Sequence, residues 1–248
     1  MNSHFDNKAK EYVNGRPGYP KEILRKLKEL GIGKDSLIAD IGAGTGLLTN
    51  LLCELDGRVL AVEPNLEMLN ECRQYCGSKS NIEFIQASAE RTGLKEQSVD
   101  IITIAQAFHW FDKSLSKVEF RRILKEDGWV IILWNDMQTD SEFAKEYVQM
   151  LYKYKVKSTA GISNFDPDTE KYNFFGQDFV KIHYDNFQGV KEEALIGNAS
   201  SLSYTPSKVD RNYEDFVQEI RNLFMKYQED GKVTFHYKTE VCLCQFAN

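Results

Sequence analysis

IADIGAGTGL, residues 38–47, is the stretch of this chain that decides the fold. An apolar run leads into three closely spaced glycines, and leucines then recur at helical spacing as far as Leu55. A buried strand, a glycine turn and a helix in this order make room for a nucleotide-like ligand at the edge of an α/β sheet. Glu63 ends the next apolar run, and a carboxylate at that point suits the hydroxyls of a ribose. The stretch therefore predicts a cofactor site.

The chain around this turn alternates strand and helix patterns. Apolar runs at residues 36–41, 58–63, 82–87, 99–106 and 129–135 are too continuous for half-exposed strands, so they indicate a parallel sheet. Helical patterns separate these runs, at residues 20–31, 47–55, 65–76 and 112–125. Asp112 is a candidate N-cap, and Gly128 is a candidate stop before the fifth strand. The first half of the chain is predicted to be an α/β core.

The pattern changes after Asn135. Residues 141–154 and 211–227 have helical periodicity, whereas residues 158–176 and 193–206 are rich in turn-forming and small polar residues. Two late strands, at about 179–187 and 233–246, are candidates for an edge hairpin. We predict a single domain over residues 1–248, with an N-terminal lid at 1–19 and a cofactor-binding core at 20–136. A mainly helical cap at 137–232 contains the edge strand, and the final strand at 233–246 completes the chain.

Composition limits the classes of function. The 248 residues are 42% hydrophobic and 12% aromatic, which is enough to bury the core of a globular domain. The formal net charge of −6 disfavours nucleic-acid binding, because that requires clustered Lys and Arg. The N-terminus lacks the apolar core of a signal peptide, and no run approaches the ~18 apolar residues of a membrane span. We expect a cytoplasmic protein, monomeric or homodimeric, with no nucleic-acid or membrane partner.

The five cysteines are scattered, and their odd number does not suit a disulfide framework. Reduced thiols are the simpler interpretation. Cys72 and Cys76 lie one helical turn apart, and Cys242 and Cys244 would point to the same side of a strand. This spacing resembles that of zinc ligands only superficially, because no His pair accompanies it. We expect no metal.

The spacing of the glycines narrows the ligand. A dinucleotide fingerprint would require glycine at position 47, where this chain has Leu47. The first and third glycines remove side chains where the loop turns sharply and where a ligand presses on backbone N–H groups. Asp40, just before the turn, would repel phosphates but could accept hydrogen bonds from an ammonium group or organise the loop amides. A nucleoside joined to an amino acid fits these features best.

Residues 20–135 resemble the class I S-adenosylmethionine-dependent methyltransferases. The resemblance lies in DIGAGTG at 40–46, AVEPNLEML at 61–69 and IQASAERTGLKEQSVDIITIAQAFHWFD at 85–112. It implies a Rossmann-like, doubly wound α/β sheet of seven mostly parallel strands with an antiparallel edge strand, S-adenosyl-L-methionine as cofactor and S-adenosyl-L-homocysteine as product. GRPGYP at 15–20, AQAFHWFD at 105–112 and SLSYTP at 201–206 are similar to the small-molecule group that includes trans-aconitate methyltransferase-like proteins.

The resemblance also assigns roles to single residues. It places Glu63 at the ribose and Gln106 beside the sulfonium, with His109 and Trp110 following at the mouth of the sheet. Many relatives carry Asp at the position of Ser88, so the adenine contact there is weaker or falls to the next two residues. The cofactor contacts expected from the resemblance are Gly42, Ala43, Gly44, Gly46, Glu63, Pro64, Asn65, Met68, Ser88, Ala89, Glu90 and Gln106.

Residue chemistry adds further candidates outside these motifs. Arg16 is a candidate ligand of the cofactor carboxylate or of an acidic acceptor, with Tyr12 near it in sequence, and Asp40 joins the cofactor set. His109 is the catalytic candidate and, with Trp110, a candidate acceptor contact. The candidate acceptor contacts on the cap are Asn198, Ser203 and Tyr204. Each has a structural alternative: core packing for Met68, loop packing for His109 and solvated surface for Arg16.

The expected reaction is methyl transfer by in-line displacement to a small-molecule acceptor. A carboxylate acceptor is already anionic at neutral pH and needs only positioning, whereas an amine or phenol would give His109 a proton to accept. A non-catalytic S-adenosylmethionine-binding protein is an alternative, because binding motifs do not report turnover. An NAD-dependent oxidoreductase is a weaker one, since the glycine spacing is wrong and a second mononucleotide-binding half is absent from the pattern.

Overall fold

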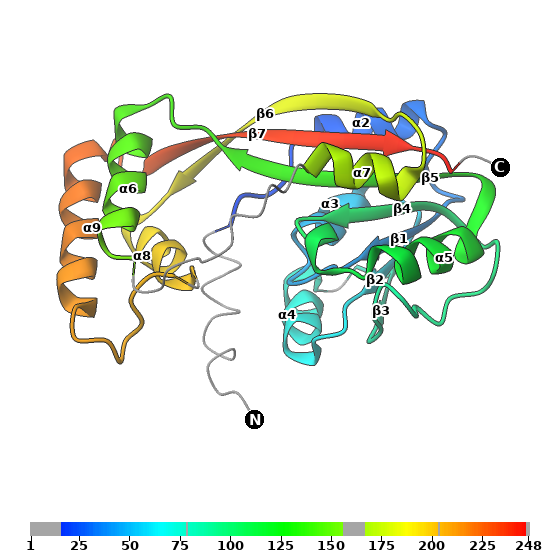
Figure 1. The fold of residues 1–248 in the computed structure, drawn as a ribbon, viewed down its shortest axis with the longest axis horizontal. Helices are drawn as coiled ribbons and strands as arrows, with labels where there is room; N and C mark the ends of the chain where they lie inside the picture. Colours follow the sequence, from blue (N-terminus) through cyan, green and yellow to red (C-terminus); the bar gives the residue numbers. More distant parts are fainter. Residues whose placement is uncertain (1–15, 78, 156–166, 203, 247–248) are drawn as a thin grey trace. The chain divides into compact units, whose positions relative to one another are not determined.

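The structure is a computed structural model that describes residues 16–77, 79–155, 167–202 and 204–246. The chain forms two compact units, and Figure 1 shows their helices and strands. The core unit consists of Gly18–Asn135, Phe165–Tyr184 and Thr239–Asn248. The helical unit consists of Met1–Pro17, Asp136–Asn164 and Asp185–Lys238. The division into lid, core and cap made from the sequence stays a prediction.

A seven-stranded sheet runs through the fold in the order β3-β2-β1-β4-β5-β7-β6. The first five strands of this order pair in parallel, and β7 and β6 complete the sheet as antiparallel strands. The strands are β1 Leu37–Ile41, β2 Arg58–Val62, β3 Ile82–Ile85, β4 Val99–Ala105, β5 Leu124–Met137, β6 Val180–Val190 and β7 Val233–Cys244. The Rossmann-like fold class predicted from the sequence is confirmed.

The strand order reverses at β1, which pairs with β2 on one side and with β4 on the other. In open parallel sheets, ligands bind outside the carboxyl ends of the strands at such a switch point. The carboxyl end of β1 is where the glycine turn begins. The topology therefore directs attention to the edge formed by the ends of β1, β2 and β4.

Alternating side chains of the central strands bury two faces of the core unit. On one face, Ile38 and Ile101 pack with α2 (Glu22–Glu29) and α3 (Leu47–Leu52). On the other face, Ala39 and Ile102 pack with α5 (Lys113–Ile123) and α7 (Pro167–Phe175). Helix α4 (Leu66–Cys76) forms a small cluster against β2, and the short turns η1 (Cys53–Leu55) and η2 (Phe108–Trp110) complete the unit. Two buried faces explain the continuous apolar runs in the sequence.

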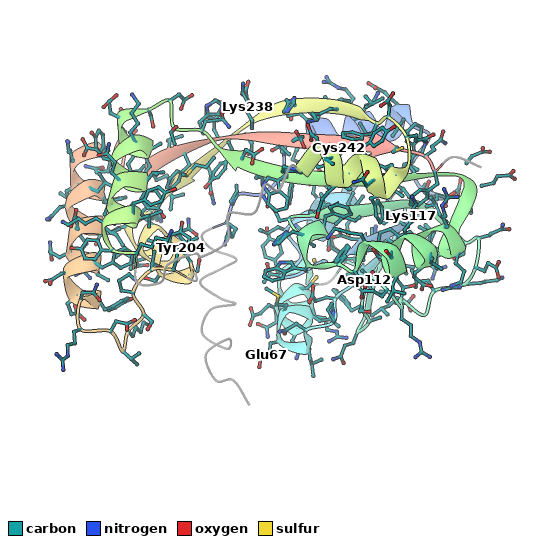
Figure 2. All side chains as sticks on the ribbon, in the orientation of Figure 1. Glu67, Asp112, Lys117, Tyr204, Lys238 and Cys242 are labelled. Carbon is teal, nitrogen blue, oxygen red and sulfur yellow. The ribbon has the colours of Figure 1, made fainter. Side chains whose placement is uncertain are left out.

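The helical unit has its own core. Helices α6 (Glu142–Lys153), α8 (Glu192–Ser201) and α9 (Tyr213–Tyr227) pack together through aromatic and aliphatic side chains. Phe216 and Ile220 of α9 are fully buried, as the helical periodicity predicted. Figure 2 labels Tyr204, which packs against this cluster.

Two helices of the structure were not predicted. Helices α7 and α8 lie in segments whose composition indicated turns and loops. The predicted stop at Gly128 is wrong: α5 ends at Ile123, β5 begins at Leu124, and Gly128 lies inside the strand. A Cβ at Gly128 would lie 2.5 Å from Leu124 Cγ and 3.1 Å from the Asp100 carbonyl, so glycine there permits close packing beside a register shift. The two late strands are neighbours, although α8 and α9 separate them in the chain.

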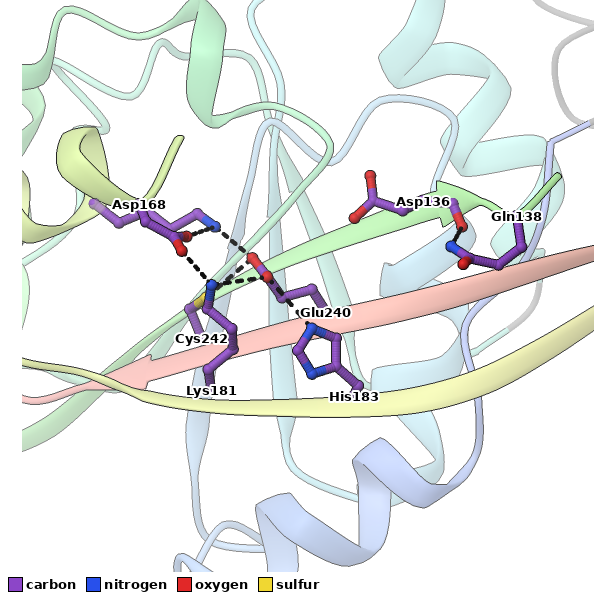
Figure 3. A network of polar contacts seen from close by, with 8 residues as sticks. Asp136, Gln138, Asp168, Lys181, His183, Glu240 and Cys242 are labelled. Atoms are coloured by element: carbon purple, nitrogen blue, oxygen red, sulfur yellow. Dashed lines mark hydrogen bonds and ion pairs between the residues drawn. The ribbon is translucent and has the colours of Figure 1, made fainter. Parts of the chain in front are cut away.

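An ionic network attaches α7 to the two antiparallel strands of the core unit, as Figure 3 shows. The Lys171 ammonium, from α7, is buried and bonds the carboxylates of Glu240 on β7 and Asp168. Lys181 on β6 bonds the same two carboxylates. Buried ions require such pairing, because an unpaired charge is costly to bury. The network explains how a helix with little apolar periodicity is held in place.

Candidate active site

The glycine turn follows β1 and contains three residues in a left-handed backbone conformation. The φ angles are +71° at Gly42, +56° at Gly44 and +89° at Gly46, a region that favours glycine. A Cβ at Gly42 would lie 2.5 Å from Ala107 Cβ, and one at Gly46 would lie 2.6 Å from Cys72 Sγ. The first and third glycines thus allow the turn to pack against the protein. A Cβ at Gly44 would meet nothing closer than 4.0 Å, so the middle of the turn is open.

The amides of the turn are bonded within the protein. The N–H groups of Gly42 and Ala43 donate to the Val62 carbonyl at 2.8 and 3.1 Å, and the Gly46 N–H donates to the Ala43 carbonyl at 2.9 Å. The N–H groups of Gly42 and Gly46 thus already have partners within the protein. The carbonyl oxygens of the turn can accept hydrogen bonds from an ammonium group.

Glu63 follows β2 and connects the turn to the next helix. Its Oε2 accepts the Gly44 N–H at 2.9 Å, and its Oε1 accepts the Asn65 N–H at 3.0 Å. Burial raises the pKa of Glu63, and these two amide hydrogen bonds oppose the rise. Each carboxylate oxygen can accept a second hydrogen bond. The carboxylate can thus hold the turn in place and still accept from a pair of hydroxyl groups.

The predicted ribose and adenine segment begins α4. Asn65 is the N-cap, and its Oδ1 accepts from the N–H groups of Glu67 and Met68 at 2.9 and 3.1 Å. Met68 is half-buried, unlike the fully buried Leu69 that follows it. The Pro64 carbonyl accepts from Gln86 Nε2 at 3.3 Å, which ties the end of β3 to this segment. The structure therefore brings Pro64, Asn65 and Met68 together beside Glu63.

Ser88, Ala89 and Glu90 form a turn after β3. The Arg91 N–H donates to the Ser88 carbonyl at 3.2 Å, and Ala89 is buried. Glu90 Oε1 accepts the Asp112 N–H at 2.9 Å. Although burial opposes it, hydrogen bonds from Ser88 and from this amide hold the pKa of Glu90 below its usual value. The Glu90 carboxylate thus fixes the loop that precedes α5.

Asp40 is buried at the end of β1 and turns its carboxylate toward two threonines. Its Oδ2 accepts from Thr49 Oγ1 at 2.6 Å, and its Oδ1 accepts from Thr103 Oγ1 at 3.0 Å. Burial raises the pKa of Asp40 to about 6, against the opposing effect of the two hydroxyls. The carboxylate connects β1, α3 and β4, and so fixes the frame around the glycine turn.

Gln106 and the η2 turn follow β4 at the same edge of the sheet. Gln106 has a φ angle of +56°, which is unfavourable for a residue with a side chain, and its N–H donates to the Leu133 carbonyl at 3.1 Å. The His109 ring lies 4.7 Å from the Trp110 ring and 5.2 Å from the Trp134 ring, centroid to centroid. Trp110 is 79% exposed, which is unusual for tryptophan. Burial and the charge of Lys113 lower the pKa of His109.

The remaining predicted residues belong to the helical unit. Burial raises the pKa of Tyr237 to about 12 and also raises the pKa of Tyr147 and Tyr204, and in each case the positive charge of Arg16 opposes the rise. The positive charge of Arg16 therefore acts on all three tyrosines. Asn198 is on α8, and its Oδ1 is buried without a hydrogen-bond partner among the described residues. Tyr12 and Ser203 lie outside the described residues.

Sequence reasoning missed several polar residues of this edge. Thr49 and Thr103 hold Asp40, and Thr103 is the polar residue within the apolar run 101–105, a signal that could have identified it. Trp134 and Asn135 end the core part of β5, where the apolar run gives way to a polar residue. Thr45 lies between two of the glycines and is 2% exposed. Thr45 was not predicted as a site residue, because the motif is defined by its glycines.

Comparisons with known proteins assign the family. A family model described as a methyltransferase domain matches residues 39–132. A provisionally named methyltransferase from Dictyostelium discoideum is 35% identical over 237 residues, which cover 90% of this chain and 86% of that protein. The chain belongs to the class I S-adenosylmethionine-dependent methyltransferases. It is therefore a methyltransferase enzyme, as predicted from its sequence.

Further relatives match this methyltransferase along most of its length. An uncharacterized methyltransferase from Schizosaccharomyces pombe is 25% identical over 243 residues, which cover 95% of this chain and 94% of that protein. The solved structure of a type II methyltransferase, provisionally named, from Anaeromyxobacter dehalogenans has a TM-score of 0.67 at 20% identity, covering 93% of this chain and 98% of that one. The structural likeness shows a shared fold.

The residues of the core unit fit S-adenosylmethionine, the cofactor that the family implies. Thr45 Oγ1 is buried and has no hydrogen-bond partner in the described part of the chain, so a polar group of a ligand can satisfy it. The middle of the turn is open at Gly44, and both oxygens of Glu63 can accept further hydrogen bonds. Thr45, Gly44 and Glu63 thus offer a hydroxyl, an open turn and a hydrogen-bond acceptor at one edge of the sheet.

The described residues contain neither a helix that could span a membrane nor a group of side chains that could hold a metal ion. Within residues 16–77, 79–155, 167–202 and 204–246, helices are all too short or too polar to cross a membrane. Over the same ranges, no three His, Cys, Asp or Glu side chains gather in a group that could hold a metal ion. The five cysteines are reduced and buried.

Proposed function

We propose that this methyltransferase transfers the methyl group of S-adenosylmethionine to a small-molecule acceptor that carries a carboxylate. The observation that carries the cofactor part is the Glu63 carboxylate bonded to the glycine turn, in a chain of the methyltransferase family. The carboxylate class of the acceptor rests on Arg16 and its tyrosines in the helical unit.

Bound S-adenosylmethionine supplies an electrophilic methyl group on a sulfonium, so the protein needs no covalent intermediate. The residues of this chain bind and orient. Glu63 accepts the ribose hydroxyls, the carbonyls of the glycine turn accept from the ammonium group, and Thr45 Oγ1 gains a partner. Holding the acceptor oxygen in line with the methyl group can contribute ~7–11 kcal/mol to lowering the barrier.

Arg16 and the tyrosines suit an acidic acceptor. Because burial raises the pKa of Tyr147, Tyr204 and Tyr237, their hydroxyls stay protonated and act as hydrogen-bond donors. Arg16 adds a permanent positive charge that can bind a carboxylate through two parallel hydrogen bonds. A cation accompanied by neutral donors is the chemistry that recognises a carboxylate.

His109 has a positioning role in this reaction. Burial and the charge of Lys113 lower the pKa of His109, so its imidazole is neutral at neutral pH. A carboxylate acceptor has no proton to give up, and the ring then acts as a wall with Trp110 and Trp134. The same neutral imidazole could accept a proton from a phenol or an amine, which makes these acceptors the second candidate class.

The test is methyl transfer from cofactor with an isotopically labelled methyl group to a panel of carboxylic acids, phenols and amines. We expect labelled methyl esters, which mild alkali hydrolyses to methanol, whereas methyl ethers and methylamines survive that treatment. Arg16→Gln should raise the KM of the acceptor at least tenfold, and Arg25→Gln, at an exposed position of α2, is the matched control. Transfer only to phenols or amines would contradict the carboxylate class. Cofactor binding with no transfer to any panel member would favour a non-catalytic binding protein.

A further inference from the structure

Asn135 ends the part of β5 that belongs to the core unit, and it is hydrogen-bonded there to Thr239, Gly18 and Gln106. Its Oδ1 accepts from Thr239 Oγ1 at 2.6 Å, and its Nδ2 donates to the Gly18 carbonyl at 3.2 Å. Its main-chain carbonyl accepts from Gln106 Nε2 at 3.2 Å. The side chain is largely buried, and Thr239 is fully buried. One residue thus connects the ends of β4 and β5, strand β7 and the segment before α2.

The hydrogen bond from Asn135 to Gly18 links distant parts of the chain. It joins residues 117 positions apart and holds an exposed glycine, whose added Cβ would meet nothing within 4 Å. Steric packing at Gly18 therefore does not fix this point of the chain. The next residue, Tyr19, packs partly against the apolar cluster of α2 and α3. The segment is thus attached by the packing of Tyr19 and by the hydrogen bond from the Asn135 amide to Gly18.

The attachment lies at the edge of the sheet that carries the cofactor residues. Strand β5 pairs in parallel with β4, and β4 with β1, so the carboxyl ends of these strands share one edge. Gln106, which bonds the Asn135 carbonyl, follows β4 at this edge in its strained conformation. The hydrogen bond from Asn135 thus holds residues 18–20 at the carboxyl edge of the sheet, where Gln106 and the glycine turn also lie.

We propose that Asn135 is a positioning residue: its amide fixes residues 18–20 at the carboxyl edge of the sheet, and this segment contributes to binding of S-adenosylmethionine. The inference rests on the proposed function, because it assumes that this edge binds the cofactor. It differs from a purely structural role for Asn135, which would satisfy the buried hydroxyl of Thr239 and nothing more.

A double substitution separates these two roles. Asn135→Ala alone leaves the Thr239 hydroxyl buried without its partner, which destabilises the fold whatever else Asn135 does. Replacing both partners by apolar groups is much less costly, so Asn135→Ala/Thr239→Val should regain most of the lost melting temperature. The main-chain bond to Gln106 is present in every variant. Thr239→Val alone is the matched control, because it keeps the amide that bonds Gly18.

The readouts are the Kd of S-adenosylhomocysteine by calorimetry and hydrogen exchange of the backbone amides of residues 18–24. We expect the double variant to bind at least tenfold more weakly than Thr239→Val and to exchange faster in this segment, although its melting temperature is no lower, because Thr239→Val removes only one partner of the buried bond to Asn135. Equal affinity and equal exchange in the two variants would overturn the proposal. If the wild-type chain itself does not bind S-adenosylhomocysteine, the proposed function fails, and that result is distinct from a failure of the positioning role.

Discussion

Asp40 and Glu63 are both acids at the carboxyl end of a buried strand, yet their surroundings give them different roles. Asp40 accepts hydrogen bonds from the hydroxyls of two threonines on α3 and β4, so it connects three elements beneath the turn. Glu63 accepts two backbone N–H groups from the segments that would surround a nucleoside. The first carboxylate supports the frame, and the second is placed to bind ligand hydroxyls.

The pKa of Asp40 predicts how stability depends on pH. The pKa is about 6 in the folded protein and 3.8 as the reference for the unfolded chain, so the fold favours the protonated form. The contribution of this group to the free energy of unfolding should be highest below pH 3.8. The free energy of unfolding of the wild type should fall by about 3 kcal/mol as the pH rises through 6, at about 1.4 kcal/mol per unit of pKa. Asp40→Asn does not titrate. Urea unfolding at pH 4, 5, 6 and 7 should show the variant gaining stability relative to the wild type, and parallel curves would contradict this.

A substitution at His109 separates catalysis from cofactor binding. His109 lies on η2, and its ring packs against the rings of Trp110 and Trp134. His109→Ala should lower kcat at least tenfold and change the Kd of S-adenosylhomocysteine less than threefold. His183→Ala, at a half-exposed site on β6, is the control for loss of an imidazole. An equal loss of kcat and affinity in His109→Ala would show that the residue is structural.

At the scale of elements, the glycine turn is held between two neighbours. Helix α4 presses Cys72 and Cys76 against Gly46, and the loop after β4 presses Ala107 against Gly42. The helix after the turn is short, because α3 gives way to η1 at Cys53. The turn is therefore shaped by tertiary contacts as well as by the conformational freedom of its glycines.

Gly46→Ala tests this packing. Both Gly46 and Gly93 have positive φ, but a Cβ at Gly46 would lie 2.6 Å from Cys72 Sγ, whereas one at Gly93 would meet nothing within 4 Å. Both substitutions incur the backbone cost of roughly 1–2 kcal/mol, and only Gly46→Ala adds a clash. We expect the melting temperature to fall further in Gly46→Ala than in Gly93→Ala, with weaker S-adenosylhomocysteine binding in Gly46→Ala alone. Equal effects would show that the contact with α4 is unimportant.

In the helical unit, His236 joins β7 to two other segments. Its Nδ1 lies 2.8 Å from Asp140 Oδ2, its Nε2 lies 2.9 Å from Asp185 Oδ1, and its ring stacks on Phe187 with centroids 4.6 Å apart. Hydrogen bonds to Asp185 and Asp140 raise the pKa of His236. Both ring nitrogens can donate to carboxylates only when the imidazole is protonated.

This arrangement predicts a second pH dependence. Because the pKa of His236 is higher in the folded than in the unfolded chain, its contribution to stability is complete below pH 6.5 and is lost as the pH rises through the folded value. His236→Gln should lower the melting temperature at pH 6 and have a smaller effect at pH 9. Asp140→Asn/Asp185→Asn should remove the same dependence. A constant difference between His236→Gln and wild type at both pH values would contradict the assignment.

At the scale of the whole molecule, the features that could be predicted from sequence were strands and helices that leave a regular pattern of residue types. Strands buried on both faces gave continuous apolar runs, and Asn65 and Asp112 marked the starts of helices as N-caps. Helix α8 was missed because its small polar residues have low helical propensity, and packing of Leu195 and Ala199 into the helical unit stabilises it. Helix α7 begins with Pro167 and early acidic residues, a usable signal.

In the candidate site too, some residues could be singled out from the sequence and others could not. The glycine turn and Glu63 could be singled out from the sequence because their spacing is typical of a cofactor site. The partners of Asp40 and Asn135 were not, because Thr103, Thr239 and Gly18 come from distant parts of the chain and only the folded sheet brings them close. The acceptor could not be identified from the sequence, because the proposed acceptor residues Arg16, Tyr147, Tyr204 and Tyr237 come from separate segments and follow no motif.

Binding of S-adenosylmethionine through Glu63 is the central proposal, and titration calorimetry with S-adenosylhomocysteine tests it directly. The wild type should bind S-adenosylhomocysteine and not NADH, and Glu63→Ala should raise the Kd more than tenfold, since two charge-assisted hydrogen bonds of about 1.5–3 kcal/mol each are lost. Glu83→Ala, which removes an exposed carboxylate on β3, is the control and should bind as the wild type does. An unchanged Kd in Glu63→Ala would contradict the assignment of the ribose site, and preferential binding of NADH would contradict the cofactor itself.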